Sequence, residues 1–168
     1  DLGPMIARDD RGPAKSVQDD ALGPRTMYLR WRELFDLRKP IVVAVQGYCL
    51  GSPVEIVLHA DISIAADNAW FGYPPVRGTG MPDTQMFVYQ VGPQWTKRIL
   101  MTGDRISGTT AKEIGLVSEV VPVAELEQRA WELARSMCQV SSPILEAVKR
   151  VTNQAVEIMG YSALQRLN

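Results

Sequence analysis

The sequence predicts an α/β fold in which short strands and helices alternate, because two different hydrophobic periodicities occur along the chain. Residues 41–45 form an apolar, β-branched run of strand length, and residues 61–66 alternate like a second strand. Apolar side chains spaced three and four residues apart indicate amphipathic helices at about 25–37 and 124–140. A strand that is apolar on both faces is typical of a covered sheet, so we expect helices to flank it.

The chain divides by pattern into three regions. Residues 1–24 mix proline, glycine and charges without periodicity, which predicts a loop that can be mobile. Residues 25–122 contain the predicted strands and are expected to form an α/β core, and residues 123–168 are predicted to be helical. We therefore expect one core followed by a helical C-terminal region.

Local signals place the remaining elements. Pro53 suits the first position of a short helix, because its missing N–H would be unpaired there anyway. Five proline and glycine residues within 74–82 predict a loop, after which Asp83 or Thr84 is expected to cap a helix. A further helix is expected after Pro93. Later in the chain we expect a helix at 110–114, a strand at 116–121 and a helix from residue 144.

Charge and hydropathy argue against two classes of partner. The 18 Lys and Arg residues are balanced by 19 Asp and Glu residues, so no excess positive charge is available to neutralise the phosphates of a nucleic acid. No apolar run approaches the roughly 20 residues that span a bilayer, and the first residues lack the pattern of a signal peptide. We therefore expect neither nucleic acid nor membrane as a partner.

The numbers and positions of the cysteines and the histidine limit the redox and metal chemistry that this chain can support. Cys49 and Cys138 lie in separate predicted elements, which favours two buried thiols in a reducing compartment over a disulfide, and hence a cytoplasmic protein. A zinc site is not expected, because His59 is the only histidine and no Cys-x-x-Cys pair occurs.

Five segments, in order and at nearly constant spacing, carry a resemblance to a known family. They are Lys39–Tyr48 (KPIVVAVQGY), Leu50–Glu55 (LGSPVE), Asp61–Gly72 (DISIAADNAWFG), Leu100–Ser107 (LMTGDRIS) and Ala111–Val117 (AKEIGLV). Each segment alone is a weak signal, whereas five in register are a strong one. Together they resemble the crotonase superfamily, the enoyl-CoA hydratase/isomerase family, over about residues 39–151. The resemblance implies the C-terminal two-thirds of a subunit.

The resemblance also implies an architecture and a substrate class. The family fold is a spiral of ββα units followed by C-terminal helices that make trimer contacts, so a homotrimer or hexamer is expected. The family acts on acyl-CoA thioesters without a tightly bound cofactor, and coenzyme A enters as part of the substrate. The family's first oxyanion donor lies in an upstream "A-G-x-D-L" segment, and the sequence begins with the Asp1-Leu2 that would follow it. We therefore expect that donor to lie outside this chain.

The resemblance places one backbone donor at the segment Gly51-Ser52-Pro53. In the family, the amide of the middle glycine of G-G-G stabilises the thioester oxygen, and that position is Ser52 here. Two N–H groups aimed at an oxygen that gains negative charge lower the barrier of reactions at Cα or Cβ. The alternative interpretation is a simple strand-to-helix turn with proline at the first helical position.

Glu55 matches the first of the two family carboxylates, which implies a role as acid/base. An acidic residue in the apolar context of residues 54–58 is costly unless it faces a cleft or a partner. The alternative is an ordinary glutamate that suits the first turn of a helix.

The second family carboxylate is replaced by Pro75, which can neither donate nor accept a proton. The loop that follows is shorter than in the family, which indicates a substrate other than a plain short enoyl chain. Asp83 can replace the lost carboxylate, and its alternative role is the helix cap. The resemblance makes Gly51, Tyr73, Pro75 and Asp83 candidate substrate-binding residues.

His59 follows Glu55 by four residues and is expected on the same helix face. A relay partner for Glu55, half of a metal site and a packed histidine are all open, and the packed histidine is favoured because no third ligand is visible.

The leading hypothesis is an enoyl-CoA hydratase- or dehydratase-like lyase with Glu55 as acid/base. One alternative is hydrolysis of a thioester or of a C–C bond on a bulky acyl-CoA. Another is a non-catalytic acyl-CoA-binding homologue, which Pro75 makes plausible.

Overall fold

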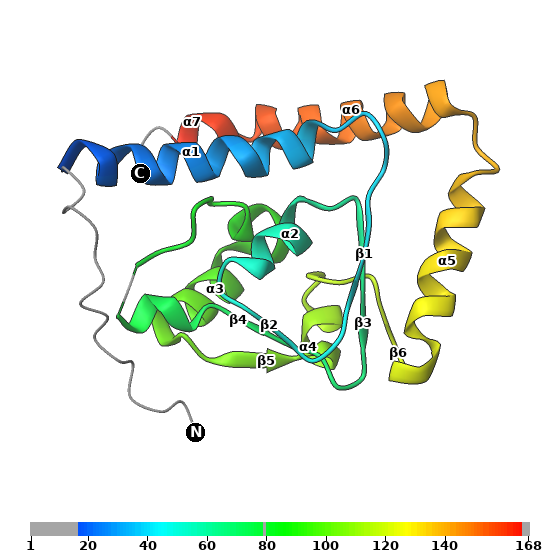
Figure 1. Cartoon of the computed structure of the whole chain (residues 1–168), viewed down its shortest axis with the longest axis horizontal. Helices are drawn as coiled ribbons and strands as arrows, with labels where there is room; N and C mark the ends of the chain where they lie inside the picture. Colours follow the sequence, from blue (N-terminus) through cyan, green and yellow to red (C-terminus); the bar gives the residue numbers. More distant parts are fainter. Residues whose placement is uncertain (1–16, 79, 166–168) are drawn as a thin grey trace.

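The computed structural model describes residues 17–78 and 80–165, with side chains from residue 27 onward (Figure 1). In chain order the elements are α1 (Val17–Asp36), β1 (Val42–Val45), β2 (Tyr48–Leu50), α2 (Pro53–His59), β3 (Ile62–Ala66), β4 (Trp70–Gly72), the 3-10 helix η1 (Pro74–Arg77), α3 (Phe87–Thr102), β5 (Arg105–Ser107), α4 (Gly108–Glu113), β6 (Glu119–Val121), the 3-10 helix η2 (Val123–Glu125), α5 (Leu126–Met137), α6 (Ser142–Ile158) and α7 (Tyr161–Gln165).

The strands form two small sheets that share a repeating connection. In the first sheet β3 lies between β1 and β6, and both pairings are parallel, with Val42 opposite Ile62 and Ile64 opposite Glu119. In the second sheet β4 pairs in parallel with β2 and antiparallel with β5. From β1 to β4 consecutive strands therefore alternate between the sheets, and a helix follows each of these two pairs, whereas β4 and β5 belong to the same sheet. The predicted α/β class and the ββα arrangement are confirmed.

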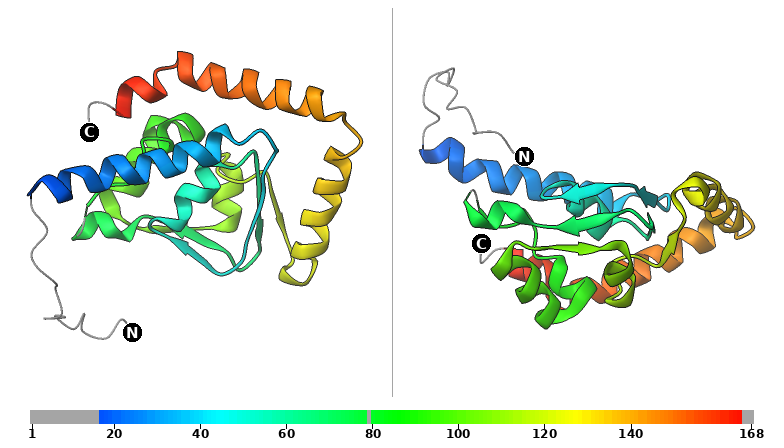
Figure 2. Two further views of the ribbon diagram at one scale, coloured as in Figure 1. Left: turned by 45° about the horizontal axis from the view of Figure 1, so that its top comes forward. Right: turned by 90° about the horizontal axis from the view of Figure 1, so that it is seen from below.

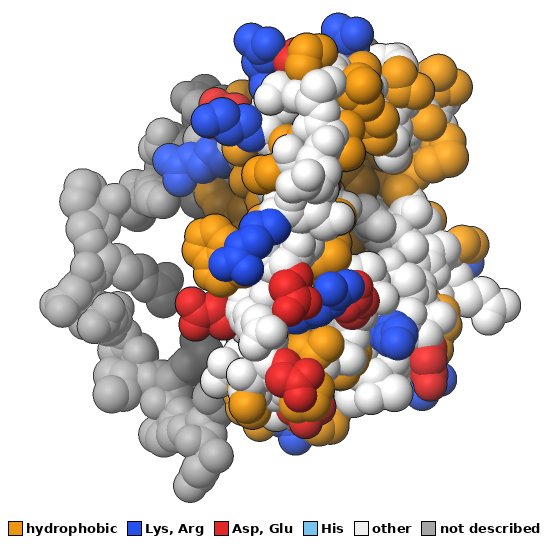
Figure 3. Space-filling model, turned by 90° about the vertical axis from the view of Figure 1, so that its right-hand side faces the viewer, with side chains coloured by type: hydrophobic (Ala, Val, Ile, Leu, Met, Phe, Trp, Pro, Cys, Tyr) orange, Lys and Arg blue, Asp and Glu red, His pale blue; other side chains and the backbone are white. Residues whose placement is uncertain are grey.

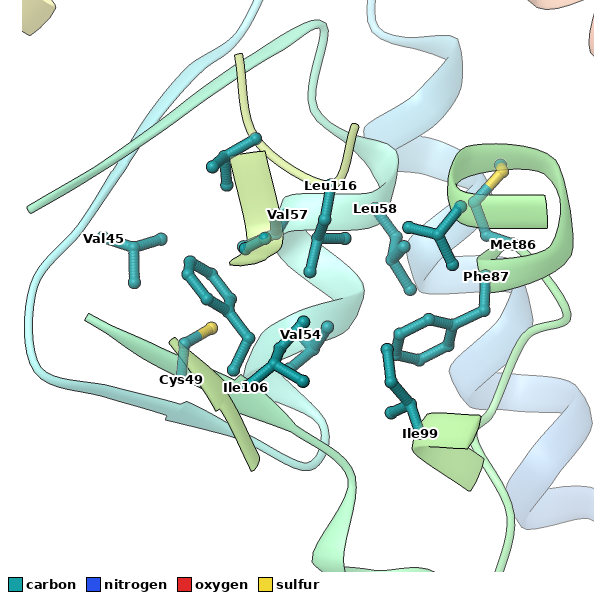
Figure 4. Close-up of a cluster of buried hydrophobic side chains, with 14 of the residues drawn as sticks. Val45, Cys49, Val54, Val57, Leu58, Met86, Phe87, Ile99, Ile106 and Leu116 are labelled. Atoms are coloured by element: carbon teal, nitrogen blue, oxygen red, sulfur yellow. The ribbon is translucent and has the colours of Figure 1, made fainter. Parts of the chain in front are cut away.

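Helix α2 is fixed by burial on several sides. Val54 and Leu58 of this helix are fully buried, and Val57 is nearly so. Side chains from both sheets, α2 and α3 point into one cluster (Figure 4). Each such aliphatic side chain contributes about 1.5–3 kcal/mol when it leaves water. The residues carried by α2 are therefore held in defined positions.

Helices α1, α6 and α7 form a layer beside α2 (Figures 1 and 2). α1 and α6 lie side by side in opposite directions, and Arg32 of α1 makes an ion pair with Glu157 of α6. The buried Lys149 Nζ of α6 lies 2.8 Å from Asp61 Oδ2, at the start of β3. α5 stands at the other end and covers β1 and β3. The C-terminal helices are thus tied to the core by charged pairs as well as by packing.

The main elements agree with the sequence, and three differences have physical reasons. The predicted loop at 1–24 is wrong over residues 17–24, because α1 begins at Val17, and residues 1–16 lie outside the described part. Local proline and glycine content predicted a loop, but such propensity is only a weak prior, and the helix runs through Gly23 and Pro24. The division into three regions stays a prediction, although residues 142–158 and 161–165 are helical.

The segment around α3 shows the other two differences. The predicted break before Pro93 is confirmed, since Gly92 has φ 72° and interrupts the helical backbone. The helix begins at Phe87, so the predicted cap by Asp83 or Thr84 is wrong, and both side chains bond elsewhere. The strand β5 was not expected, because three residues are too few to show a periodicity.

Two further observations concern the environment of the protein. No helix in the described ranges is long and apolar enough to cross a membrane. Both cysteines are free thiols and Cys49 is buried, as predicted, but the predicted burial of Cys138 is wrong, because it follows the end of α5 and is exposed.

Candidate active site

The turn from β2 into α2 depends on a glycine. Gly51 has φ 73°, a left-handed conformation that side-chain-bearing residues rarely adopt. Its amide donates to the Gly72 carbonyl at 2.9 Å. A Cβ at Gly51 would lie 3.2 Å from Cγ of Pro75, so the two predicted site residues are close neighbours. The turn and the 3-10 helix η1 therefore constrain each other.

The amide of Ser52 lies at the beginning of α2. The next two amides along the chain have backbone partners. The Val54 amide donates to the Gly51 carbonyl, and the Glu55 amide donates to the Ser52 carbonyl. Within the described part of the chain, the Ser52 amide itself donates to no backbone carbonyl. The first amides of a helix have no partner inside the helix and can serve a ligand. The geometry is compatible with the predicted donor.

Tyr73 is buried between the turn and α3. Its ring makes an edge-to-face contact with Phe87, with 6.4 Å between ring centroids. Burial raises the pKa of the Tyr73 hydroxyl to about 12, although a hydrogen bond with the Ser52 side chain opposes the rise. Tyr73 is 3% exposed. Its ring therefore packs against α3, and its hydroxyl is close to the Ser52 side chain.

Glu55 is fully buried, and both of its carboxylate oxygens are hydrogen-bonded. Oε1 accepts from the Thr84 amide at 3.1 Å, and Oε2 accepts from the Thr84 hydroxyl at 2.6 Å. Burial raises the pKa of Glu55 to about 7, and the hydrogen bonds from Thr84 oppose this rise. The negative charge of Asp83 raises it further. A carboxyl group with a pKa near neutrality is suited to both donate and accept a proton.

Asp83 belongs to the same loop, but its carboxylate points to a different helix. Its Oδ2 accepts a hydrogen bond from Trp31 Nε1 of α1 at 3.1 Å. The backbone amide of Asp83 also hydrogen-bonds Glu55 and lowers its pKa. The loop thus brings Asp83 close to Glu55 while the Asp83 side chain ties the loop to α1.

His59 is packed at the end of α2, as the favoured interpretation predicted. Its Nδ1 lies 2.7 Å from the backbone carbonyl of Glu55, and its Nε2 lies 2.7 Å from the hydroxyl of Tyr161. The rings of Trp31 and Phe35 flank it. Burial lowers the pKa of His59 to about 4, and the nearby positive charge of Arg32 lowers it further. The imidazole is therefore neutral at pH 7.

Metal binding finds no support in the described ranges, where no three His, Cys, Asp or Glu side chains are grouped as ligands. The Nδ1 atom of His59 and Oε2 of Glu55 are 3.8 Å apart, which is longer than a hydrogen bond.

Sequence reasoning missed two residues of this site, Thr84 as a hydrogen-bond partner of Glu55 and Tyr161 as a partner of His59. Thr84 was considered only as a helix cap, and a threonine next to an aspartate gives no other signal. Tyr161 lies 102 residues from His59 in a five-residue helix. No periodicity or spacing links the two positions.

Two cavities lie elsewhere in the molecule. One of about 290 Å³ lies between α1 and α6, where Arg38 and Glu146 face each other across an ion pair. The other, of about 210 Å³, lies between the end of α3 and β5 and is lined by Arg98 and Arg105. Neither is lined by Glu55, whose carboxyl group is enclosed because the residue is 0% exposed.

Comparisons with known proteins agree with this architecture. The probable mitochondrial enoyl-CoA hydratase of Dictyostelium discoideum is 35% identical over 132 residues, which is 77% of this chain and 48% of that protein. The 2,3-dehydroadipyl-CoA hydratase of Escherichia coli is 34% identical over 131 residues, or 76% of this chain and 51% of that protein. The chain thus spans about half the length of the curated relatives it matches.

Solved structures show the same relationship in three dimensions. A probable enoyl-CoA hydratase from Mycobacterium smegmatis superposes with a TM-score of 0.86 at 26% identity, covering 93% of this chain and 65% of that one. A second enoyl-CoA hydratase from the same organism gives a TM-score of 0.80 at 32% identity, covering 94% and 59%.

The family model that matches is the enoyl-CoA hydratase/isomerase model, which aligns with residues 10–166. This range includes both sheets, α2 with Glu55 and the C-terminal helices. The chain therefore belongs to the enoyl-CoA hydratase/isomerase family, the crotonase superfamily that the five sequence segments indicated.

Proposed function

We propose that this protein processes acyl-CoA thioesters by hydrating an enoyl-CoA or dehydrating the corresponding hydroxyacyl-CoA, with Glu55 as acid/base. The observation that carries the proposal is a buried carboxyl group whose pKa is raised to about 7, one turn away from the Ser52 amide, which donates to no backbone carbonyl of the described residues. Relatives of 34–35% identity are named as hydratases of enoyl-CoA and 2,3-dehydroadipyl-CoA, which supports this reaction class. Coenzyme A enters as part of the substrate, and no tightly bound cofactor is needed.

The residues of the site suffice for the proton transfers of hydration. Glu55 as carboxylate accepts a proton from water while the hydroxyl oxygen bonds to Cβ, and the electron pair of the double bond moves toward the thioester oxygen. The Ser52 amide, together with the family's upstream donor, stabilises the negative charge on that oxygen. Glu55 then returns the proton to Cα. Because Pro75 cannot carry a proton, one carboxyl group performs both transfers.

The Glu55 carboxylate can still accept a hydrogen bond from water or from the substrate. The two carboxylate oxygens have four lone pairs, of which Thr84 uses one on each oxygen and the Asp83 amide uses a third, so one is left for a partner. Gly51, Tyr73, Pro75 and Asp83 stay our proposed neighbours of the acyl group, with Gly51 and Pro75 in near contact. The proline and the shortened loop favour an acyl group other than a short linear chain.

A second candidate function, acyl-CoA binding without catalysis, is favoured by one observation. Glu55 is 0% exposed and Pro75 replaces its expected partner, so both family carboxylates are inaccessible or absent here. Hydrolysis of a thioester or C–C bond is the enzymatic alternative, because a single carboxyl group can activate water.

One experiment separates these candidates. The full-length protein is incubated with crotonyl-CoA and with a panel of bulky acyl-CoA esters, beside the Glu55→Gln variant. For the proposed enzyme, the variant lowers kcat by about 10²–10⁴-fold, because the general acid/base is lost. Release of free CoA instead of hydroxyacyl-CoA would identify a hydrolase. Thermal stabilisation by CoA esters without turnover in either protein would contradict the enzyme and support the binding function.

We further propose a homotrimer or hexamer, as in the family. Exposed apolar residues recur at one-turn spacing along α6, with Ile144, Val148 and Val151 each more than half exposed. Hydrophobic side chains gather toward the top of the face that carries α5 and the start of α6 (Figure 3). Exposed apolar patches of this kind support an interface. Light scattering coupled to gel filtration measures the mass, and a monomer at micromolar concentration would contradict the proposal.

We also infer a cytoplasmic location, which the two free thiols support because they suit a reducing compartment. Relatives named as mitochondrial make the mitochondrion the alternative. Fractionation of the source cells distinguishes the two.

A further inference from the structure

The side-chain amide of Gln85, in the loop before α3, is an exception to the pairing of buried polar groups in this molecule. Its Nε2 atom is buried and has no hydrogen-bond partner within the described ranges, where the only other such side-chain atom is Nε2 of Gln165 in α7. By contrast, Nε2 of Gln90 donates to the Leu58 carbonyl at 3.1 Å. A buried donor without an acceptor loses the hydrogen bond that it makes with water in the unfolded chain. Gln85 therefore lowers the stability of the folded protein.

The backbone on both sides of Gln85 is held in place. The Thr84 amide donates to Oε1 of Glu55 at 3.1 Å, and the Thr84 hydroxyl donates to Oε2 at 2.6 Å. On the other side, the Met86 amide donates to the Thr84 hydroxyl at 3.3 Å, and Met86 is 1% exposed. A backbone shift that brought Gln85 to an acceptor would therefore break the hydrogen bonds that hold Glu55.

The same hydrogen bonds place Gln85 close to the proposed acid/base. Because consecutive Cα atoms are about 3.8 Å apart, the Cα atom of Gln85 lies within about 8 Å of Oε1 of Glu55. An acyl group whose reacting carbons lie against Glu55 is then within range of the Gln85 side chain a few bonds further along. The donor without a partner thus lies next to the place where the proposed substrate reacts.

The chemistry of the amide and the nearby charge limit what the missing partner is. A side-chain N–H pairs with an oxygen acceptor. The negative charge of Asp83 acts on both Glu55 and Tyr73, and a hydrogen bond from Trp31 holds that carboxylate in place. A carboxylate brought here by a ligand would be repelled by Asp83. An uncharged oxygen, as in a hydroxyl or an oxo group, pairs with the amide without that repulsion.

We propose that Gln85 is a specificity-determining residue, whose side-chain amide donates to an uncharged hydroxyl or oxo oxygen on the acyl chain of the CoA ester. The inference rests on the proposed function for the nature of the ligand, and it adds the chemistry of the acyl group. In the complex, this bond supplies the partner that the amide lacks in the free protein. A plain hydrocarbon chain leaves the donor unpaired, and a site that bonds an oxygen discriminates strongly against the analogue without it.

The first test measures substrate preference in the full-length protein. Hexenoyl-CoA is compared with hexenoyl-CoA esters that carry a hydroxyl or oxo group at each carbon beyond Cβ. We expect kcat/KM of at least one oxygenated ester to exceed that of hexenoyl-CoA by about tenfold or more. Gln85→Met keeps an unbranched side chain and removes the donor, so this ratio is expected to fall to about one. The absence of a preference, or a preference that survives in Gln85→Met, would overturn the proposal.

The second test measures stability, which does not depend on turnover. Because Gln85→Met removes a buried donor that has no partner, we expect the Tm of the free protein to rise by about 2–4 °C. Gln165→Met is the matched control, since it removes the other unpaired amide nitrogen and is expected to leave the ratio of kcat/KM values unchanged. A lower Tm of Gln85→Met, or its failure to fold, would mean that the amide is paired in the free protein and would overturn the proposal.

Equilibrium binding separates this inference from the proposed function. Calorimetry gives the Kd of hexanoyl-CoA and of its oxygenated counterparts, which lack the double bond and undergo no hydration. A preference in Kd that disappears in Gln85→Met, in a protein that hydrates no enoyl-CoA, contradicts the proposed reaction alone. Hydration that depends on Glu55 but shows no preference for an oxygenated acyl group contradicts the role of Gln85 alone.

Discussion

The two ends of α2 are built in different ways. At the N-terminal end, Gly51, Ser52 and Pro53 are consecutive residues, and the group that we propose as the donor to a ligand is a backbone amide. Further along, Glu55 and His59 are held by side chains from the loop before α3 and from α7. A backbone donor tolerates changes of side chain as long as the turn keeps its conformation. A side-chain network does not, because each member supplies a particular hydrogen or lone pair.

The opposing pKa shifts within the side-chain network lead to the largest effect that we predict for stability. The pKa of Glu55 is raised from 4.5 to about 7, so its stabilising contribution is complete below pH 4.5 and is lost as the pH rises toward 7. The pKa of His59 is lowered from 6.5 to about 4, so its contribution is complete above pH 6.5 and is lost as the pH falls toward 4. Where these two pH ranges overlap, the two opposite changes in the free energy of unfolding cancel in the unmodified protein.

A single substitution at either residue removes one of the two pH-dependent contributions and leaves the other measurable. In Glu55→Gln, stability relative to the unmodified protein is expected to rise by about 3 kcal/mol as the pH rises from 4 to 7, because only the His59 term remains. In His59→Gln it is expected to fall by about the same amount over that range. Urea denaturation at half-unit pH steps measures the difference. If the plots of unfolding free energy against pH stay parallel to that of the unmodified protein, neither residue has a shifted pKa in the folded state.

The difference between the two ends also explains what could be predicted from sequence. The segments that match the family are contiguous, so Gly51 and Ser52 could be placed at the start of one helix, and Glu55 in its first turn, from the order of residues alone. The partners of Glu55 and His59 lie 29 and 102 residues away, and burial, not spacing, brings them together. Asp83 was expected at a helix end, but its carboxylate bonds Trp31 of α1. Side-chain direction in a proline- and glycine-rich loop depends on tertiary contacts that a local pattern does not contain.

A substitution at Gly51 tests the conformation on which the backbone donor depends. Gly51→Ala places a Cβ at φ 73° and 3.2 Å from Cγ of Pro75, so we expect a loss of about 1–2 kcal/mol. For a chain of this size that corresponds to a Tm lower by about 2–8 °C. Gly78→Ala is the matched control, since Gly78 has φ −166° and nothing lies within 4 Å of its Cβ position. Equal losses of stability in both variants would contradict the requirement for glycine at position 51.

The smallest effect is expected for the side chain of Ser52, because the proposed donor is its amide. Ser52→Gly removes the hydrogen bond with Tyr73 and adds backbone freedom, which together cost at most about 1 kcal/mol of stability. The N–H and the helical start at Pro53 stay in place, so kcat is expected to remain within about twofold of the unmodified value. Turnover of acyl-CoA and a thermal melt measure both quantities on one preparation. A tenfold or larger loss of kcat would mean that the serine hydroxyl contacts the substrate, and the N-terminal end of α2 would then depend on side chains as the Glu55 network does.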